Sequence, residues 1–139
     1  MPKLSRRLIK AGMLYFVFAM LLAVAANAQE VWHFWRLLDA VQPVFYHALM
    51  VGWITQIIFG VSIWMFPRHT RKQPRGSEQM GWASFYLLNT GLLMRIIAEP
   101  AAVVSSAAMW SGGLLISAAL QWLAAIFYVF NIWKRVKGK

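Results

Sequence analysis

The amino-acid sequence predicts an all-α fold, an integral membrane four-helix bundle with a short interfacial helix on its outer side. Hydrophobic residues account for 60% of the 139 residues and charged residues for only 13%. Such a composition leaves too little polar surface to cover a soluble core of this size. Four long apolar stretches and three basic clusters complete the pattern, and no internal repeat divides it. Residues 1–139 are therefore expected to form a single four-helix transmembrane domain.

Four segments each offer about the twenty apolar residues that a helix needs to cross a hydrocarbon layer of roughly 30 Å. Pro67 ends the second segment, and Ser77 is a candidate cap for the third. Glu99-Pro100 is expected to close the third, because the residue before a proline disfavours the α region. The small-residue stretch 101–108 either extends the fourth helix or lies along the outer surface. The four segments are residues 11–28, 43–66, 81–98 and 112–133.

The basic residues indicate how these helices are oriented. By the positive-inside rule their three clusters belong on the cytoplasmic side, which gives an N-in/C-in protein of the bacterial inner membrane. There they would also meet anionic headgroups of the lipid bilayer, whereas such separated clusters argue against a nucleic-acid partner. Of the 14 Lys and Arg residues, twelve form these clusters: Lys3, Arg6, Arg7 and Lys10; Arg68, Arg71, Lys72 and Arg75; and Lys134, Arg135, Lys137 and Lys139.

The first segment has a second interpretation. Its basic residues, its apolar run and Ala26-Asn-Ala28 before Gln29 also describe a secretory signal peptide. Cleavage would remove residues 1–28 and leave three helices with the new amino terminus outside. Retention is favoured, because the apolar run is long for a signal peptide.

An interfacial helix is expected over residues 31–41, between the first two spanning segments. Aromatic, apolar and polar residues alternate there at helical spacing, which is typical of a helix lying at the membrane surface. The lipid-facing residues would be Trp32, Trp35 and Leu38, and the solvated ones His33, Arg36 and Asp39.

Several functions are disfavoured by what the chain lacks. Without cysteine it has no disulfide, no thiolate metal site and no thioether attachment for haem. No set of histidine, serine and carboxylate comes together on one side for hydrolysis. The polar residues near mid-membrane include no carboxylate, so they are expected to form an interhelical hydrogen-bond cluster and not a transport site. They are Gln56, Asn89, Thr90 and Gln121.

His47 is the one histidine inside a spanning segment, about one turn below the outer surface. An ionisable residue at such a depth usually marks a functional site, and a neutral imidazole binds metals. Arg95 reaches a similar depth from the third segment. It would pair with Glu99 one turn away, with anionic groups of a ligand, or with both. His47 itself would ligate a metal or haem, relay protons, or hydrogen-bond to a backbone carbonyl or to Thr90, Asn89 or Gln121.

The sequence around His47 resembles a known family. His47-Ala-Leu-Met50, then Phe59-Gly60, then Trp64-Met-Phe-Pro67-Arg68 resembles the second helix of the catalytic subunit of haem-copper oxidases and nitric oxide reductases, and segments of NnrS-type proteins. Residues 81–95 resemble the helix that follows. The resemblance implies that His47 is an axial ligand of a low-spin haem, here haem b. The propionates of that haem would then be the anionic ligand groups with which Arg95 could pair.

The chain also departs from that family. Those subunits have about twelve helices, a second axial histidine and a histidine cluster for a second metal, whereas this chain has three histidines, His33, His47 and His69. It therefore encodes no binuclear centre and is not expected to be an enzyme on its own. A bare copper or zinc ion is disfavoured because too few donors lie at that depth.

A second axial ligand for the haem has several possible sources. A symmetric homodimer would bring two copies of His47 to one haem, with Gly52 and Gly60 admitting close packing between subunits. The same glycines would serve packing within one chain equally well. Within one chain the candidate ligands are Met94, Met50, Met109 and His33.

The sequence thus predicts a haem b protein that transfers electrons or senses a diatomic gas, NO or O2, near the outer membrane face. A respiratory-chain protein would be its partner. The alternative is a cofactor-free structural or assembly subunit of a respiratory membrane complex, in which His47 and Arg95 stabilise the bundle. A small transporter is disfavoured by the scarcity of membrane-embedded charge.

Overall fold

The structure is a computed structural model that describes residues 1–32, 41–67 and 76–136. Residues 33–40 of the expected interfacial helix, with His33, and the basic loop with His69 lie outside these residues, while residues 31 and 32 end α1 and residue 41 begins α2. The described segments form helices and no strand, which confirms the all-α prediction. The helices are α1 (Lys3–Trp32), α2 (Val41–His47), η2 (Ala48–Thr55), α3 (Gln56–Met65), α4 (Glu78–Val104) and α5 (Ala108–Trp133).

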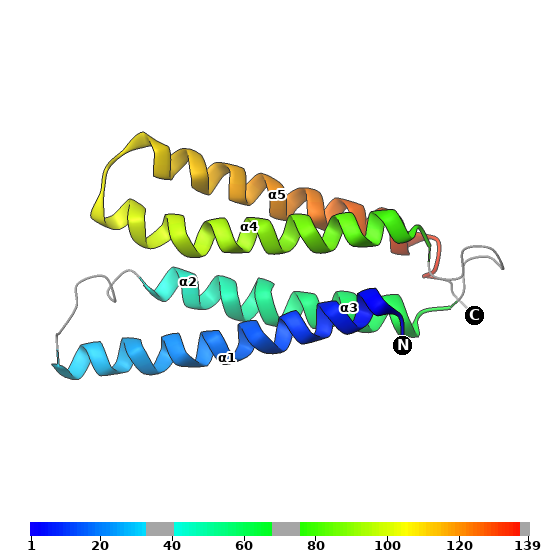
Figure 1. Ribbon diagram of the computed structural model, residues 1–139, viewed down its shortest axis with the longest axis horizontal. Coiled ribbons are helices and arrows are strands. Elements are labelled where there is room, and N and C mark those ends of the chain that lie inside the picture. The colour runs from blue at the N-terminus through cyan, green and yellow to red at the C-terminus, as the bar shows by residue number, and fades with distance from the viewer. Residues whose placement is uncertain (33–40, 68–75, 137–139) are drawn as a thin grey trace.

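The helices form two antiparallel hairpins laid against each other (Figure 1). In one hairpin α1 packs along the continuous helix α2–η2–α3, and in the other α4 packs along α5. The helix starts of α1 and α4 and the helix ends of α3 and α5 share one end of the bundle, called the basic end below. The opposite end is called the far end. The first and last helices thus meet at the same end, as an N-in/C-in arrangement requires, while the membrane side of that end stays a prediction.

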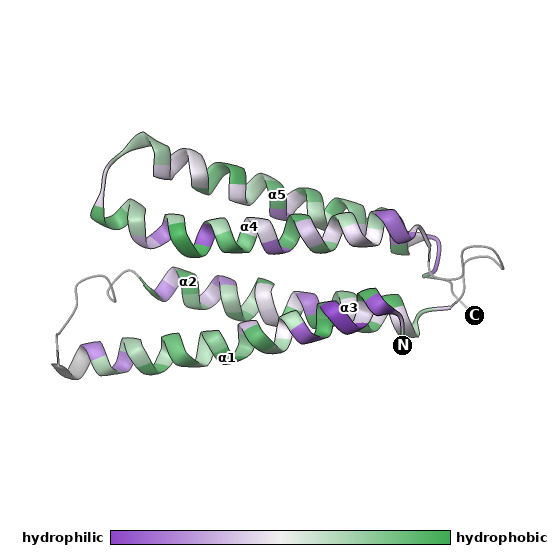
Figure 2. Cartoon of the chain, in the orientation of Figure 1, coloured by the Kyte–Doolittle hydropathy of each residue, from purple (hydrophilic) through white to green (hydrophobic). Residues whose placement is uncertain are grey.

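Hydrophobic residues make up most of the length of the described helices (Figure 2). Four helices are long and apolar enough to cross a membrane, with α2, η2 and α3 counted as one. Large hydrophobic side chains point outward, for example Leu14 at 72% and Leu115 at 73% exposure. Such a surface fits lipid and not water. The fold therefore indicates a multi-pass membrane protein.

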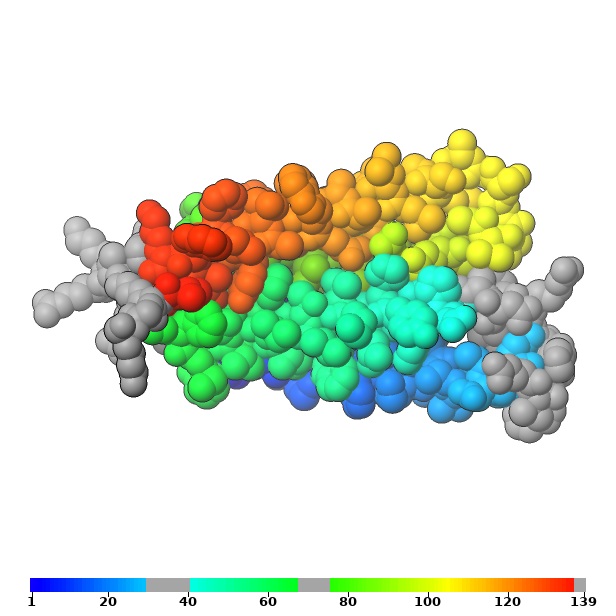
Figure 3. Space-filling view, turned by 180° about the vertical axis from the view of Figure 1, so that it is seen from behind, coloured from blue at the N-terminus to red at the C-terminus, as the bar shows by residue number. Residues whose placement is uncertain are grey.

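The core lies toward the basic end, where all four spanning helices meet. Buried Leu8, Leu88, Leu92 and Phe59 contribute from α1, α4 and α3. The ring of Phe59 stacks on Tyr128 of α5, with ring centroids 3.6 Å apart. Viewed from behind, α3 and α5 lie side by side at this end (Figure 3).

Gly52 and Gly60 are used for packing within the chain. A Cβ atom at Gly52 would lie 2.6 Å from Cγ of Tyr15, and one at Gly60 would lie 2.9 Å from Cγ1 of Ile9. Both glycines therefore let η2 and α3 approach α1 closely. This is the intrachain alternative, and it leaves neither glycine free to receive a second subunit.

A π-helical segment, η2, follows directly after His47 and was not predicted from the sequence. Its widened turn is marked by Thr55, whose Oγ1 donates to the carbonyl of Met50, five residues earlier, at 2.9 Å. His47 and Gln56 are nine residues apart, so a regular α-helix would rotate them by about two and a half turns onto opposite faces. The π-helix changes this rotation, and both side chains contact α4. Rare π segments often occur at functional sites.

Two helix boundaries near the far end differ from the prediction. α4 continues through Glu99 and Pro100 to Val104, so the expected end at Glu99-Pro100 is wrong. Pro100 removes only its own backbone donor, a defect that spanning helices tolerate, and Ser105 N closes the last turn on the carbonyl of Ala101 at 2.9 Å. Of the stretch 101–108, the first half ends α4 and the last residue begins α5.

Ser77 caps α4 at the basic end, as the sequence predicts. Its Oγ accepts a hydrogen bond from the backbone N–H of Met80 at 3.4 Å. Its own N–H donates to Oδ1 of Asn131 on α5 at 2.7 Å, which fixes the start of α4 against the end of α5. Gly76, with a φ of 78°, supplies the left-handed backbone that leads into this cap.

Candidate functional site

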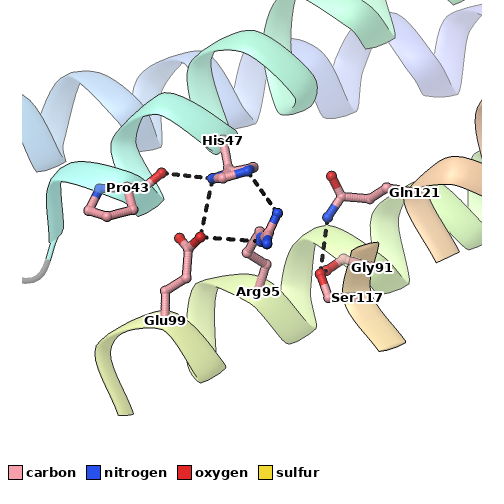
Figure 4. Close-up of polar contacts among 7 residues, drawn as sticks. All are labelled: Pro43, His47, Gly91, Arg95, Glu99, Ser117 and Gln121. Carbon is pink, nitrogen blue, oxygen red and sulfur yellow. Dashed lines mark hydrogen bonds and ion pairs between the residues drawn. The ribbon is translucent and has the colours of Figure 1, made fainter. Parts of the chain in front are cut away.

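The candidate site joins the two hairpins near the far end. Nη1 of Arg95, on α4, lies 2.8 Å from Nε2 of His47, on the last turn of α2 (Figure 4). The side chains of His47 and Arg95 are 30% and 20% exposed. The sequence predicted that His47 and Arg95 lie at a similar depth, and in the structure they are in direct contact. This contact joins the two hairpins.

Glu99 completes the cluster from the next turn of α4. Its Oε1 lies 3.2 Å from Nε of Arg95 and 3.3 Å from Nδ1 of His47. The predicted i, i+4 ion pair between Arg95 and Glu99 is confirmed. Nε of Arg95 is not aligned for a hydrogen bond, so the pair is held by charge attraction and not by a directed bond. His47, Arg95 and Glu99 together form the His47 cluster.

The partners of His47 assign a hydrogen-bond role to each ring nitrogen. A guanidinium has only donors, so Nε2 must accept the hydrogen bond from Arg95 with its lone pair. Nδ1 then carries the single proton of a neutral imidazole, and it donates to the carbonyl oxygen of Pro43 at 2.9 Å. A protonated imidazole would turn an N–H toward the guanidinium. The geometry therefore selects the neutral Nδ1–H tautomer.

Opposite charges face each other within the His47 cluster. The carboxylate of Glu99 lies within ion-pair distance of the Arg95 guanidinium, and the two side chains are only 11% and 20% exposed. Pairing of this kind is what makes ionisable residues tolerable inside a membrane. Among the described residues, Oε2 of Glu99 is buried and accepts no hydrogen bond.

The arrangement at His47 bears on whether this residue can ligate the haem that the resemblance implies. An axial ligand must offer iron a free imidazole lone pair. The lone pair on Nε2 accepts from Arg95, and Nδ1 holds the proton that is donated to Pro43. Arg95 is itself committed to His47 and Glu99 instead of facing open space for a propionate. These residues, as they are placed, do not fit an axially ligated haem.

The other predicted cofactor residues are not gathered around His47. Met50 points outward and is 53% exposed, and Met109 on α5 is 68% exposed. Met94 precedes Arg95 on α4, so it faces about 100° away from it around the helix. Gly52 packs on Tyr15. Across residues 1–32, 41–67 and 76–136, no three His, Cys, Asp or Glu side chains are placed to share a metal ion.

The mid-membrane polar residues form two separate contacts and not one cluster. Gln56 and Asn89 exchange hydrogen bonds across the hairpins at 3.3 and 3.2 Å. Gln121 instead donates to Oγ of Ser117 at 3.0 Å, and that hydroxyl donates to the carbonyl of Gly91 at 2.7 Å (Figure 4). The predicted bonds from His47 to Asn89 and Gln121 are therefore wrong, and Thr90, the third predicted partner, is exposed.

Arg135 is a site residue that the sequence placed in a solvated basic cluster. It is 1% exposed, and its guanidinium reaches from the end of α5 to the end of α3. Nε donates to the carbonyl of Pro67 at 3.0 Å, and Nη2 donates to the carbonyls of Ile63 and Phe66 at 3.0 and 2.7 Å. A cation at the carbonyl end of a helix is favoured by the helix dipole. Residue type alone gave no signal for this role.

The hairpins are therefore joined by polar contacts at successive levels of the bundle. The His47 cluster lies near the far end, the Gln56–Asn89 pair lies in the middle, and Arg135 lies at the basic end. Comparison of the chain with models of known families, with characterised proteins and with solved structures finds no match.

Proposed function

We propose that this protein is a structural or assembly subunit of a respiratory membrane complex and works without a bound cofactor. The observation that carries this proposal is the engagement of both imidazole nitrogens of His47, one by Arg95 and one by Pro43. A side chain with no free lone pair serves as a connector between helices and not as a ligand. The respiratory assignment rests on the resemblance of residues 47–68 and 81–95 to the haem-copper oxidase and nitric oxide reductase family.

The chemistry of the bundle supports a connecting role. Hydrophobic attraction between helices is weak in lipid, so interhelical hydrogen bonds and close packing must hold the hairpins together. The His47 cluster, the Gln56–Asn89 pair and Arg135 supply such bonds at three depths. Large hydrophobic side chains such as Leu14 and Leu115 point outward from the described helices, where they can face lipid or a neighbouring subunit.

The competing proposal is the haem b protein, with electron transfer or gas sensing at the outer face and a haem shared between two copies of His47. It requires Arg95 to release Nε2, and it requires space beside the imidazole for a porphyrin. Glu99 favours the cofactor-free proposal, because its carboxylate pairs with Arg95 where a haem propionate would otherwise be needed.

An optical spectrum separates the two proposals. The protein is produced in a haem-replete bacterial host and purified in mild detergent, with a parallel preparation of His47→Ala. The expected result is protein without a Soret band and without stoichiometric haem b by pyridine haemochrome. A Soret band that disappears in His47→Ala, while circular dichroism shows an intact bundle, would replace our proposal with the haem protein.

The assembly role is tested in the host membrane. Deletion of the gene should reduce the amount of an intact respiratory complex on native gels, and the wild-type chain should restore it. His47→Ala should restore less than Leu115→Ala, a matched change at an exposed lipid-facing residue. Unchanged respiratory complexes in the deletion strain would contradict the assignment.

A further inference from the structure

A basic cavity of about 410 Å³ opens between the first turns of α1 and the start of α4. It is lined by Lys3, Arg6, Arg7 and Lys10 of α1 and by Trp82 of α4. The four cations recur every three or four residues, so one face of α1 carries all of them. The first turn of α1 contains no acidic residue, and the cavity therefore has a concentrated positive charge.

These cations are not neutralised within the described part of the chain. All four are exposed, and none forms an ion pair with a described carboxylate. Glu78 contacts the lining residue Trp82, since its Oε1 accepts a hydrogen bond from Nε1 of Trp82 at 3.4 Å. This hydrogen bond directs the Nε1 edge of the indole ring toward Glu78, one turn earlier on the same helix.

An apolar cavity of about 380 Å³ lies farther along the same pair of helices. Leu14 and Phe18 of α1 line it together with Leu93 and Ile96 of α4. Leu14 and Phe18 follow Lys10 by four and eight residues, so they lie about 6 to 12 Å deeper along α1. The two cavities therefore follow one another along the seam between α1 and α4, and together they are called the groove, basic at one end and apolar beyond it.

We propose that this groove binds an anionic phospholipid. The phosphate would lie among Arg6, Arg7 and Lys10, the interfacial ring of Trp82 would flank the glycerol region, and an acyl chain would run past Leu14. The order of charge and apolar surface matches a lipid that stands upright in the leaflet at the basic end. A free phosphate or nucleotide would leave the apolar part of the groove empty. A second copy of this chain, with a formal net charge of +10, would be repelled from the basic part.

The lipid site is independent of the proposed function, since it involves neither His47 nor Arg95. It gives the basic end a specific ligand in addition to the general attraction that every basic cluster exerts on an anionic membrane. α1 and α4 pack on each other far less closely than α4 packs on α5, so a bound lipid would also fill and stabilise the α1–α4 seam.

Native mass spectrometry of the full chain, released from detergent containing phosphatidylglycerol or phosphatidylcholine, tests the site. The wild type should retain one phosphatidylglycerol at concentrations where phosphatidylcholine is lost. Arg6→Gln/Arg7→Gln should weaken retention by on the order of 25-fold, since each interfacial cation contributes about a fivefold factor. Lys134→Gln/Lys137→Gln removes the same charge from the C-terminal cluster and should leave retention unchanged.

A second pair of variants tests the apolar half. Leu93→Trp places a larger side chain in the groove, at a residue that is 56% exposed. Leu115→Trp is the matched change on an exposed face of α5. Only Leu93→Trp should weaken phosphatidylglycerol retention, and added glycerol 3-phosphate should not displace the lipid. Equal losses of phosphatidylglycerol retention in both charge variants would mean nonspecific attraction. Displacement of the lipid by glycerol 3-phosphate, with no effect of Leu93→Trp, would mean a simple phosphate site. Either result overturns the proposal.

Discussion

Arg95 donates from Nη1 to Nε2 of His47 across 2.8 Å, so the guanidinium occupies the lone pair that a metal would need. The contact also spans the two hairpins, because His47 ends α2 and Arg95 lies on α4. One hydrogen bond thus accounts for two properties of the site. It engages the lone pair of Nε2, and it ties the far end of the bundle together.

Loss of the His47 acceptor should destabilise the bundle. His47→Ala leaves the Arg95 guanidinium without its acceptor, and interhelical hydrogen bonds in membranes make us expect a loss of about 1 to 2 kcal/mol. Thermal unfolding in detergent measures the change. His47→Gln retains an acceptor oxygen and should recover part of the lost stability. Equal melting temperatures for His47→Ala and wild type would show that the contact contributes nothing.

Arg95 and Glu99 should behave as one unit. Glu99→Gln leaves a cation in a partly buried position, and Arg95→Leu leaves an anion there, so each single change should be costly. The double variant removes both charges and should cost less than the sum of the single changes, with a coupling of about 0.5 to 3 kcal/mol. Unfolding free energies for the four proteins of this cycle provide the measurement. Strict additivity would mean that the two charges do not interact.

Arg135 should be a specific cap of α3 and not a general surface cation. Arg135→Lys keeps the charge, but a single ammonium cannot reproduce the fixed planar donors that reach three carbonyls. We expect a loss of about 1 to 3 kcal/mol, because buried carbonyls lose their donors. Faster hydrogen exchange at the last turn of α3 would locate the effect. The exposed neighbour Lys134 supplies the control, since Lys134→Gln should change neither quantity.

The four spanning helices and the Arg95–Glu99 ion pair could be predicted from the sequence, because each depends on a fixed length or spacing. Membrane thickness fixes the length of an apolar helix, so composition alone located four of them. Helical geometry fixes the neighbours three and four residues away, so the pairing of Arg95 with Glu99 followed from their spacing.

The remaining parts of the site depend on relations between distant segments. Nothing in residues 48–55 shows by composition that the helix widens, yet this widening turns His47 and Gln56 toward the same neighbour. Arg135 belongs to a basic cluster in sequence, and only the position of the end of α3 makes it a buried cap. Pro100 lies inside α4, and Glu99 stays helical beside His47, which the local preference of the residue before a proline did not indicate.

Gly52 should tolerate no side chain, and the reason separates packing within the chain from packing between subunits. A Cβ at Gly52 would come within 2.6 Å of the Tyr15 ring, so Gly52→Ala should force η2 away from α1 at a cost of about 1 to 3 kcal/mol. Gly112→Ala is the matched control, because nothing lies within 4 Å of a Cβ there and α5 should gain about 0.5 to 1 kcal/mol. Thermal unfolding would measure both changes.

The oligomeric state of the same variants completes this test. If Gly52 packs only on Tyr15, then Gly52→Ala lowers the melting temperature and leaves the molecular mass in detergent unchanged, as measured by light scattering. Replacement of Tyr15 by Ala in the Gly52→Ala background should restore part of the stability, since it removes the clash. A Gly52→Ala protein that melts like wild type but loses a dimer would instead place this glycine at a subunit interface.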